Sequence, residues 1–300
     1  MTRRLFLILA LPLFLVSIDG SSAADDDSLP LAVAVALQEL TLVPEGAPLG
    51  VDPLVLLQFY GERANAPIWS SDDLAFSRAA ALVARLENAQ AEGLDPDDYA
   101  AVMVAWGTRD ATPDAYAAAQ LELMLSAATV RYISDLAFGR IDPSDVSEDL
   151  FDVPRHPDPV NLLWDAAVVS DVGAWLDGLA PAWPQYRALR RALARLRAME
   201  PDDDVMLLPD GDSLKPGMDD PRVLVLRSRL AALGASAGDH QTSTLFDPEL
   251  EAAVMDFQRR FGLDDDGIVG KHSRAMLNTT VAQRIRIVEL NMERLRWLQE

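Results

Sequence analysis

The chain has 300 residues, no cysteine and a formal net charge of -21. This charge argues against nucleic acids and anionic lipid surfaces as partners, because proteins bind both mainly through lysine and arginine. The absence of cysteine excludes disulfide bonds, so stability must come from hydrophobic cores. The length suffices for about two domains.

Residues 1–24 have the pattern of a secretory signal peptide. Two arginines precede an apolar stretch over residues 5–18, and small residues follow it. A membrane anchor is the alternative, but the stretch is short for a bilayer span and contains Pro12. We predict cleavage near Ala23 or Ala24 and export to the periplasm. No second apolar run of about 18 residues follows, so we expect no membrane contact of the mature chain.

Residues 25–200 are predicted to form a helical domain. Helix starts are marked by an aspartate or threonine N-cap followed by proline, which suits the first helical position because no amide hydrogen is needed there. Apolar residues with helical spacing follow each of these dipeptides, which begin at Asp52, Asp95, Thr112, Asp158, Asp220 and Asp247. We find no convincing alternation of apolar and polar residues at strand length, so we predict a mainly α fold.

Residues 201–219 are rich in aspartate, proline and glycine, and we interpret them as a linker. A long ordered loop within one domain is the alternative.

Residues 220–280 are predicted to form a small module of three helices, because apolar residues with helical spacing follow both Asp220 and Asp247. An Asp-Gly turn at Asp266 precedes the third helix.

The same segment carries a spaced pattern of motif positions. They are Arg229-Leu230, Ala253, Phe257-Gln258, Phe261-Gly262-Leu263, Asp266-Gly267, Val269-Gly270 and Leu277-Asn278. This pattern resembles the peptidoglycan-binding domain type 1, and the resemblance implies peptidoglycan as the partner. Most of these positions are apolar residues or glycines, so they indicate the fold more strongly than a ligand site.

Three polar side chains within or beside the motif positions are the candidate peptidoglycan contacts: Gln258, Arg259 and His272. Each has hydrogen-bond donors that could meet glycan or peptide groups. The alternative is a solvated arginine and an exposed histidine without a role in binding. The aspartates at 264–266 lack the alternating ligands of a calcium loop, so we predict a solvated turn, no metal and no cofactor.

A second pattern runs through the N-terminal part. It comprises Phe59-Tyr60, Arg63, Pro67, Trp69, Gly93-Leu94, Pro96, Asp98-Tyr99, Arg131-Tyr132, Asp135-Leu136, Gly139-Arg140, Pro143, Pro181, Tyr186, Leu189-Arg190 and Leu193. The pattern is similar to the scaffold domain of the large periplasmic L,D-transpeptidases. In that family a peptidoglycan-binding domain and then a catalytic domain follow the scaffold. Residues 281–300 resemble the helix that leads into the catalytic domain.

The resemblance implies a nucleophilic cysteine in a Ser-His-Gly-Cys type motif, and residues 1–300 contain no cysteine. Acyl transfer needs an activated nucleophile and an oxyanion-stabilising site, so we identify no catalytic residue in this chain. We predict an exported, noncatalytic peptidoglycan-binding or scaffold protein of the cell wall. The alternative is the N-terminal portion of an L,D-transpeptidase that makes 3-3 cross-links. A glycan hydrolase that uses paired carboxylates is a remote alternative.

The last predicted helix, over 281–300, is apolar on two sides. One stripe consists of Val281, Ile285, Val288, Met292 and Leu295. The opposite side carries Ile287, Leu290, Trp297 and Leu298. The three-helix module can cover only one side, so we expect a second neighbour: a catalytic domain, the N-terminal scaffold or another protein.

Overall fold

The structure is a computed structural model. It describes residues 28–42, 48–110, 113–146, 158–199, 206–235 and 242–298. Within these residues the chain forms thirteen α-helices and no strand, and only two isolated β-bridges are present. The predicted mainly α fold is therefore confirmed. The predicted signal peptide lies outside the described residues.

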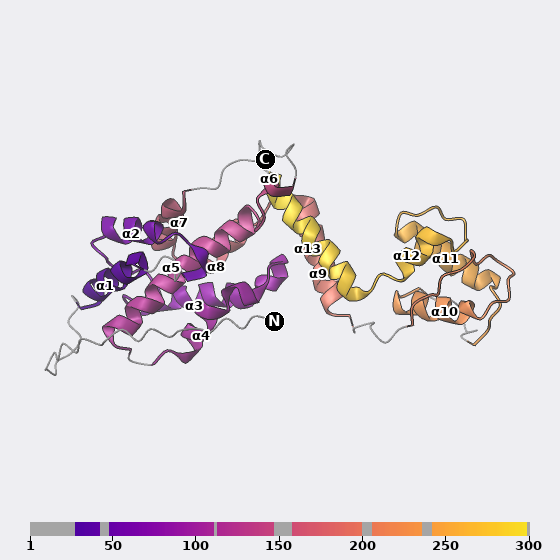
Figure 1. Cartoon of the computed structure of the whole chain (residues 1–300), viewed down its shortest axis with the longest axis horizontal. Helices are drawn as coiled ribbons and strands as arrows, with labels where there is room; N and C mark the ends of the chain where they lie inside the picture. Colours follow the sequence, from indigo (N-terminus) through magenta and orange to yellow (C-terminus); the bar gives the residue numbers. More distant parts are fainter. Residues whose placement is uncertain are drawn as a thin grey trace, which may run out of the picture.

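The described residues between 28 and 199 form a helical body built around the long helix α5 (Ala115–Ala137) (Figure 1). Side chains of α5 such as Leu123, Val130 and Ile133 are buried in one hydrophobic core with those of the surrounding helices. These helices are α1 (Ser28–Leu42), α2 (Pro53–Glu62), α3 (Asp73–Glu87), α4 (Ala100–Thr108), α7 (Pro159–Val168) and α8 (Val172–Gly178). The body also contains α6 (Pro143–Val146), α9 (Pro184–Arg197) and the 3-10 helices η2 (Pro48–Gly50), η3 (Ala89–Glu92) and η4 (Pro96–Tyr99).

Three of the predicted Asp-Pro dipeptides start an α-helix, and Asp95 starts the 3-10 helix η4, whereas the N-cap of α10 is Pro221 and not the predicted Asp220. Asp52 and Asp158 cap α2 and α7, and each accepts a hydrogen bond from a backbone amide of the first turn. Asp247 does the same for α11. Thr112 lies outside the described residues, and the next helix, α5, has Asp114 as its N-cap.

The described residues between 206 and 280 form a small module with the helices α10 (Arg222–Ala232), α11 (Pro248–Arg260) and α12 (Lys271–Leu277). Its core includes Leu208 and Leu214, which lie in the predicted linker. Leu214 pairs with Val269 in a β-bridge. The predicted linker 201–219 is therefore too long: its second half belongs to the module, because apolar residues there complete the core.

The helix α13 (Val281–Trp297) follows the small module in sequence but packs on the helical body, beside α9 (Figure 1). Val288 and Met292 of the first predicted stripe pack with Tyr186 and Leu193 of α9. Of the neighbours considered for this helix, the N-terminal scaffold is thus the one present. On the opposite side Ile287, Leu290 and Leu298 remain exposed.

Candidate functional site

The small module contains a polar hollow of about 390 Å³ between the end of α11 and the start of α12. Most of its lining comes from the loop that joins these two helices. The lining residues are Ser213, Gln258, Gly262, Leu263, Asp264, Asp266, Ile268, Gly270, Lys271, His272 and Ser273. Exposed side chains in this set include a carboxylate, a lysine and a histidine, so the hollow offers both donors and acceptors.

Gln258 fixes the loop around the hollow. Its side chain is 1% exposed, and its Oε1 accepts a hydrogen bond from the Gly267 backbone N at 2.9 Å. Its Nε2 donates to Asp266 Oδ1 at 3.0 Å, to the Ile268 carbonyl at 3.0 Å and to Ser273 Oγ at 3.2 Å. One buried amide therefore satisfies polar groups from several points of the loop, as a buried polar group requires.

Two further features hold the loop. Gly267 has a φ of +72°, and a Cβ there would lie 3.1 Å from Glu251 Cγ, so the turn favours glycine. The Ile268 backbone N–H and the Gln258 amide lower the pKa of Asp266, because both donate to its carboxylate. The predicted Asp-Gly turn is thus a rigid support for the hollow.

The three predicted contact residues have different positions. His272 is exposed and lines the hollow. Gln258 also lines it, but its buried amide is engaged by the loop, which favours a positioning role over direct contact. Arg259 is exposed outside the hollow, with Asp256 and Asp265 each at 3.9 Å. Contact of these residues with peptidoglycan stays a prediction.

Sequence reasoning missed other residues of this hollow. Lys271 and Asp264 are next to predicted positions. Their place in a polar loop was the feature of the sequence that could have identified them as lining residues. Ser213 comes from the segment interpreted as a linker. It reaches the hollow because the neighbouring Leu214 pairs with Val269, a contact between distant segments that no local pattern indicates.

The helical body contains a buried carboxyl group, Glu122, on α5. It accepts hydrogen bonds from Tyr60 Oη at 2.8 Å, the Ile68 backbone N at 2.5 Å and Ser70 Oγ at 2.7 Å. The Trp69 backbone N donates to both of its oxygens. Burial raises the pKa of Glu122. The side chain ties the segment after α2 to the centre of the body.

A second buried carboxyl group, Asp135, accepts hydrogen bonds from Tyr99 Oη at 2.7 Å and Arg131 Nε at 2.8 Å. Burial raises the pKa of Asp135 as well. Raised carboxyl pKa values are typical of general acids, but a glycan hydrolase must bring two carboxylates to an open substrate site. Glu122 and Asp135 are both buried and serve the packing of the body, which does not favour the hydrolase hypothesis.

A buried ion pair attaches α13 to the helical body. Arg296 is 1% exposed and donates from Nη1 to Glu293 Oε2 at 3.0 Å. It also donates from Nε to the Leu136 carbonyl at 3.0 Å, and from Nη2 to Tyr186 Oη at 2.9 Å and the Glu92 carbonyl at 2.5 Å. The guanidinium thus joins three separate segments of the body.

The other oxygen of Glu293 binds the chain after α5. Its Oε1 accepts hydrogen bonds from the backbone N of Arg140 at 2.6 Å and of Ile141 at 3.1 Å. Gly139 precedes them with a φ of +93°, and a Cβ there would lie 2.5 Å from the same oxygen. The Gly139-Arg140 pattern noted in the sequence therefore makes room for the α13 carboxylate.

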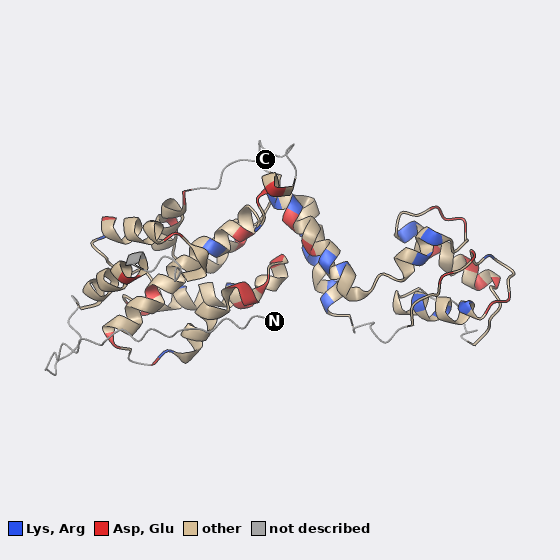
Figure 2. Ribbon diagram, in the orientation of Figure 1, with Lys and Arg blue, Asp and Glu red and all other residues tan. Residues whose placement is uncertain are grey.

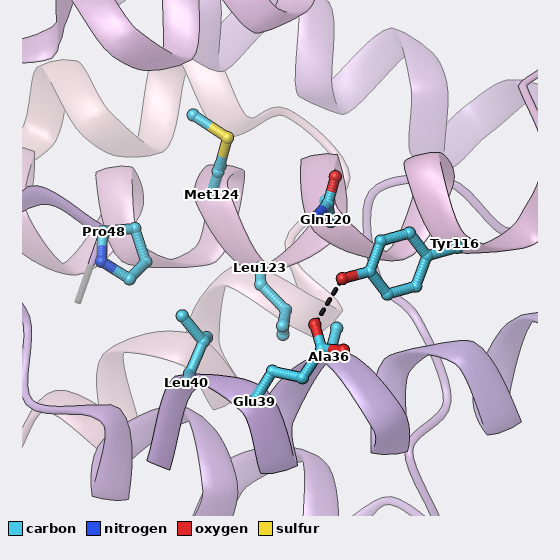
Figure 3. A pocket seen from close by; sticks show the side chains of 8 residues that line it. All are labelled: Ala36, Glu39, Leu40, Pro48, Tyr116, Gln120, Leu123 and Met124. Atoms are coloured by element: carbon cyan, nitrogen blue, oxygen red, sulfur yellow. Dashed lines mark hydrogen bonds between the residues drawn. The ribbon is translucent and has the colours of Figure 1, made fainter. Parts of the chain in front are cut away.

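A third feature is a mainly apolar hollow of about 430 Å³ between α1 and α5 (Figure 3). It is lined by Ala36, Glu39, Leu40, Pro48, Tyr116, Gln120, Leu123 and Met124. Tyr116 Oη donates a hydrogen bond to Glu39 at its edge. This lining supplies a single carboxylate, so it does not bring together the two carboxylates that the hydrolase hypothesis requires.

Comparison with protein families assigns both parts of the chain. Residues 55–193 match the family described as "Scaffold domain". Residues 219–277 match the family described as "Putative peptidoglycan binding domain". The chain combines a scaffold domain with a peptidoglycan-binding domain. The polar hollow lies within the peptidoglycan-binding domain, apart from Ser213.

The scaffold match ends within α9, so α1 and α13 extend the helical body beyond it. The comparison with curated proteins found no match. Within the part of the chain that the structure describes, no helix is long and apolar enough to cross a membrane. The same residues contain no group of three or more histidine or acidic side chains placed to hold a metal ion.

Proposed function

We propose that this chain is an exported cell-wall protein whose small module binds peptidoglycan through the hollow beside α12. The observation that carries the proposal is the hollow itself, an open polar site held rigid by Gln258 within a domain of the peptidoglycan-binding family. Export and a periplasmic location are supported by the signal-like pattern of residues 1–24.

The chemistry of the hollow suits neutral polar groups of a polymer. Lys271 and His272 supply donors, and Asp264 supplies acceptors, at one open rim. Such groups can meet sugar hydroxyls and peptide amides through several ordinary hydrogen bonds. The proposed role of the helical body is to carry the module, since α9 leads into it and α13 returns from it.

Co-sedimentation of the mature chain with purified sacculi tests the proposal. We expect binding by the unaltered chain and about tenfold weaker binding after Lys271→Ala with His272→Ala, because two donors would be lost at about 0.5–1.5 kcal/mol each. Lys215→Ala is the matched control, an exposed lysine of the same module outside the hollow. If the unaltered chain stays in the supernatant, the proposal is wrong.

One observation favours a second candidate, the N-terminal portion of an L,D-transpeptidase. The helix that resembles the one leading into the catalytic domain leaves Ile287, Leu290 and Leu298 exposed. A further domain packed on α13 would cover them. Sequencing the coding DNA beyond the codon for Glu300 tests this candidate: an in-frame Ser-His-Gly-Cys segment is expected, and a stop codon at that point would exclude it.

A further inference from the structure

The positive charge of this acidic protein is concentrated on α9 and α13. The two helices carry nine arginines and two glutamates, whereas the whole chain has 47 acidic and 26 basic residues. α9 alone has five arginines and no acidic residue. Figure 2 shows these basic positions along the paired helices. The chain therefore has a local positive surface although its net charge is -21.

Part of this surface is concave. A hollow of about 480 Å³ lies between α9 and η3, and arginines form half of its lining. The lining residues are Asn88, Gln90, Ala91, Arg187, Arg190, Arg191, Ala194 and Arg197. The α9 members share one helical face, because they are spaced by three or four residues. We call this the arginine hollow.

Two of these arginines are held in place by acidic partners. Arg190 pairs with Glu92 at 2.6 Å, and Arg197 pairs with Glu289 of α13 at 2.6 Å. Their charges are thereby largely balanced, and their side chains are oriented along the walls of the hollow. They also tie the arginine hollow to the junction of α9, η3 and α13.

The other two arginines carry unbalanced charge. Arg187 donates to the Ala182 carbonyl, and both it and Arg191 are exposed. Within the described residues neither forms an ion pair with an acidic side chain. Like charges four residues apart destabilise a helix, so the arrangement costs stability unless an anion lies between them.

We infer that the arginine hollow binds carboxylates of peptidoglycan stem peptides, as a second contact beside the hollow of the small module. The inference rests on the proposed function. Guanidinium groups bind carboxylates through paired parallel hydrogen bonds, and several of them converge here. Asn88 and Gln90 place exposed side-chain amides on the opposite wall, where they can meet the amides of a peptide.

An anionic membrane is the other partner with matching charge, and the surface fits it less well. A helix that binds a membrane surface inserts an exposed apolar face between the lipids. In α9 the apolar side chains Tyr186 and Leu193 are fully buried, and no large apolar side chain of this helix is exposed. The surface is also hollowed, which suits a side group of a polymer better than a flat headgroup layer.

The test compares two kinds of sacculi with the mature, full-length chain. One preparation is untreated, and in the other the stem-peptide carboxylates are converted to neutral amides. We expect amidation to weaken binding of the unaltered chain about fivefold. Arg187→Gln with Arg191→Gln should weaken binding to untreated sacculi by a similar factor and abolish the difference between the preparations. Arg195→Gln, an exposed arginine of the same helix outside the hollow, should leave both values unchanged.

The outcomes separate this inference from the proposed function. If the unaltered chain binds neither preparation, the proposed function fails and the inference falls with it. If the chain binds both preparations equally and the arginine variant binds as the unaltered chain does, only the inference is wrong. Co-sedimentation with phosphatidylglycerol vesicles, lost in the same variant while binding to sacculi is kept, would also overturn it in favour of a lipid.

Discussion

The attachment of α13 to the helical body and the loop around the hollow of the small module are held by different chemistry. The body fixes α13 with a buried ion pair, Glu293 and Arg296, whose remaining polar atoms bond to backbone groups. The module fixes the loop of its hollow with one uncharged amide, Gln258. A buried charge that loses its partner costs far more than a lost neutral hydrogen bond. We therefore expect the attachment of α13 to be the more sensitive of the two.

The largest effect is expected from Arg296→Met. The substitution leaves the Glu293 carboxylate buried without its cation and frees the Leu136 and Glu92 carbonyls. The free energy of unfolding of the helical body should fall by about 3–5 kcal/mol, measured by urea denaturation. Arg294→Met is the control, because Arg294 is exposed on the same helix and should change stability little. Equal stability of the two variants would contradict the role of the ion pair.

A smaller effect is expected from Gln258→Ala. The change removes the hydrogen bonds to Gly267, Ile268 and Ser273 and leaves buried loop groups unsatisfied. The module should lose about 1–3 kcal/mol of stability, and binding to sacculi should weaken because the loop is no longer fixed. Arg259→Ala, an exposed neighbour on α11, is the matched stability control. Unchanged loop dynamics in the Gln258 variant, measured by amide relaxation in NMR, would refute the positioning role.

The smallest effect concerns Glu122, where Glu122→Gln keeps the shape of the side chain. Because burial raises the pKa of Glu122, the folded state holds this proton more tightly than the unfolded chain does. Lowering the pH from neutral toward the ordinary glutamate pKa should therefore stabilise the unaltered chain relative to the variant. Urea denaturation at a series of pH values measures the difference. If the unaltered chain instead loses stability relative to the variant as the pH falls, the predicted direction is wrong.

The sequence predicted those parts of the fold that depend on local patterns. Asp52, Asp158 and Asp247 mark helix starts because an N-cap and the following proline act within one turn. The two apolar sides of α13 indicated a neighbour beyond the module, and the helical body covers the stripe around Met292. The expectation of a neighbour on both sides was wrong for Ile287 and Leu290, which are exposed. Which neighbour it has could not be read from the sequence, because several partners can cover the same apolar stripe.

The candidate site was predicted only in part, for a related reason. His272 was found because it stands beside a motif position in a polar loop. Ser213 was missed because a β-bridge between Leu214 and Val269, far apart in sequence, brings it to the hollow. Gln258 was predicted to contact the ligand, but its burial and hydrogen bonds indicate a structural role. The motif alone cannot distinguish a structural role from a role in binding.

The central claim is that peptidoglycan occupies the hollow beside α12. Hydrogen exchange of the mature chain, followed by mass spectrometry with and without soluble muropeptides, tests it most directly. A bound ligand should slow exchange of the backbone amides in residues 262–273 and leave α2, which is remote from the hollow in sequence and in fold, unchanged. Equal exchange of residues 262–273 in saturating muropeptide would contradict the claim.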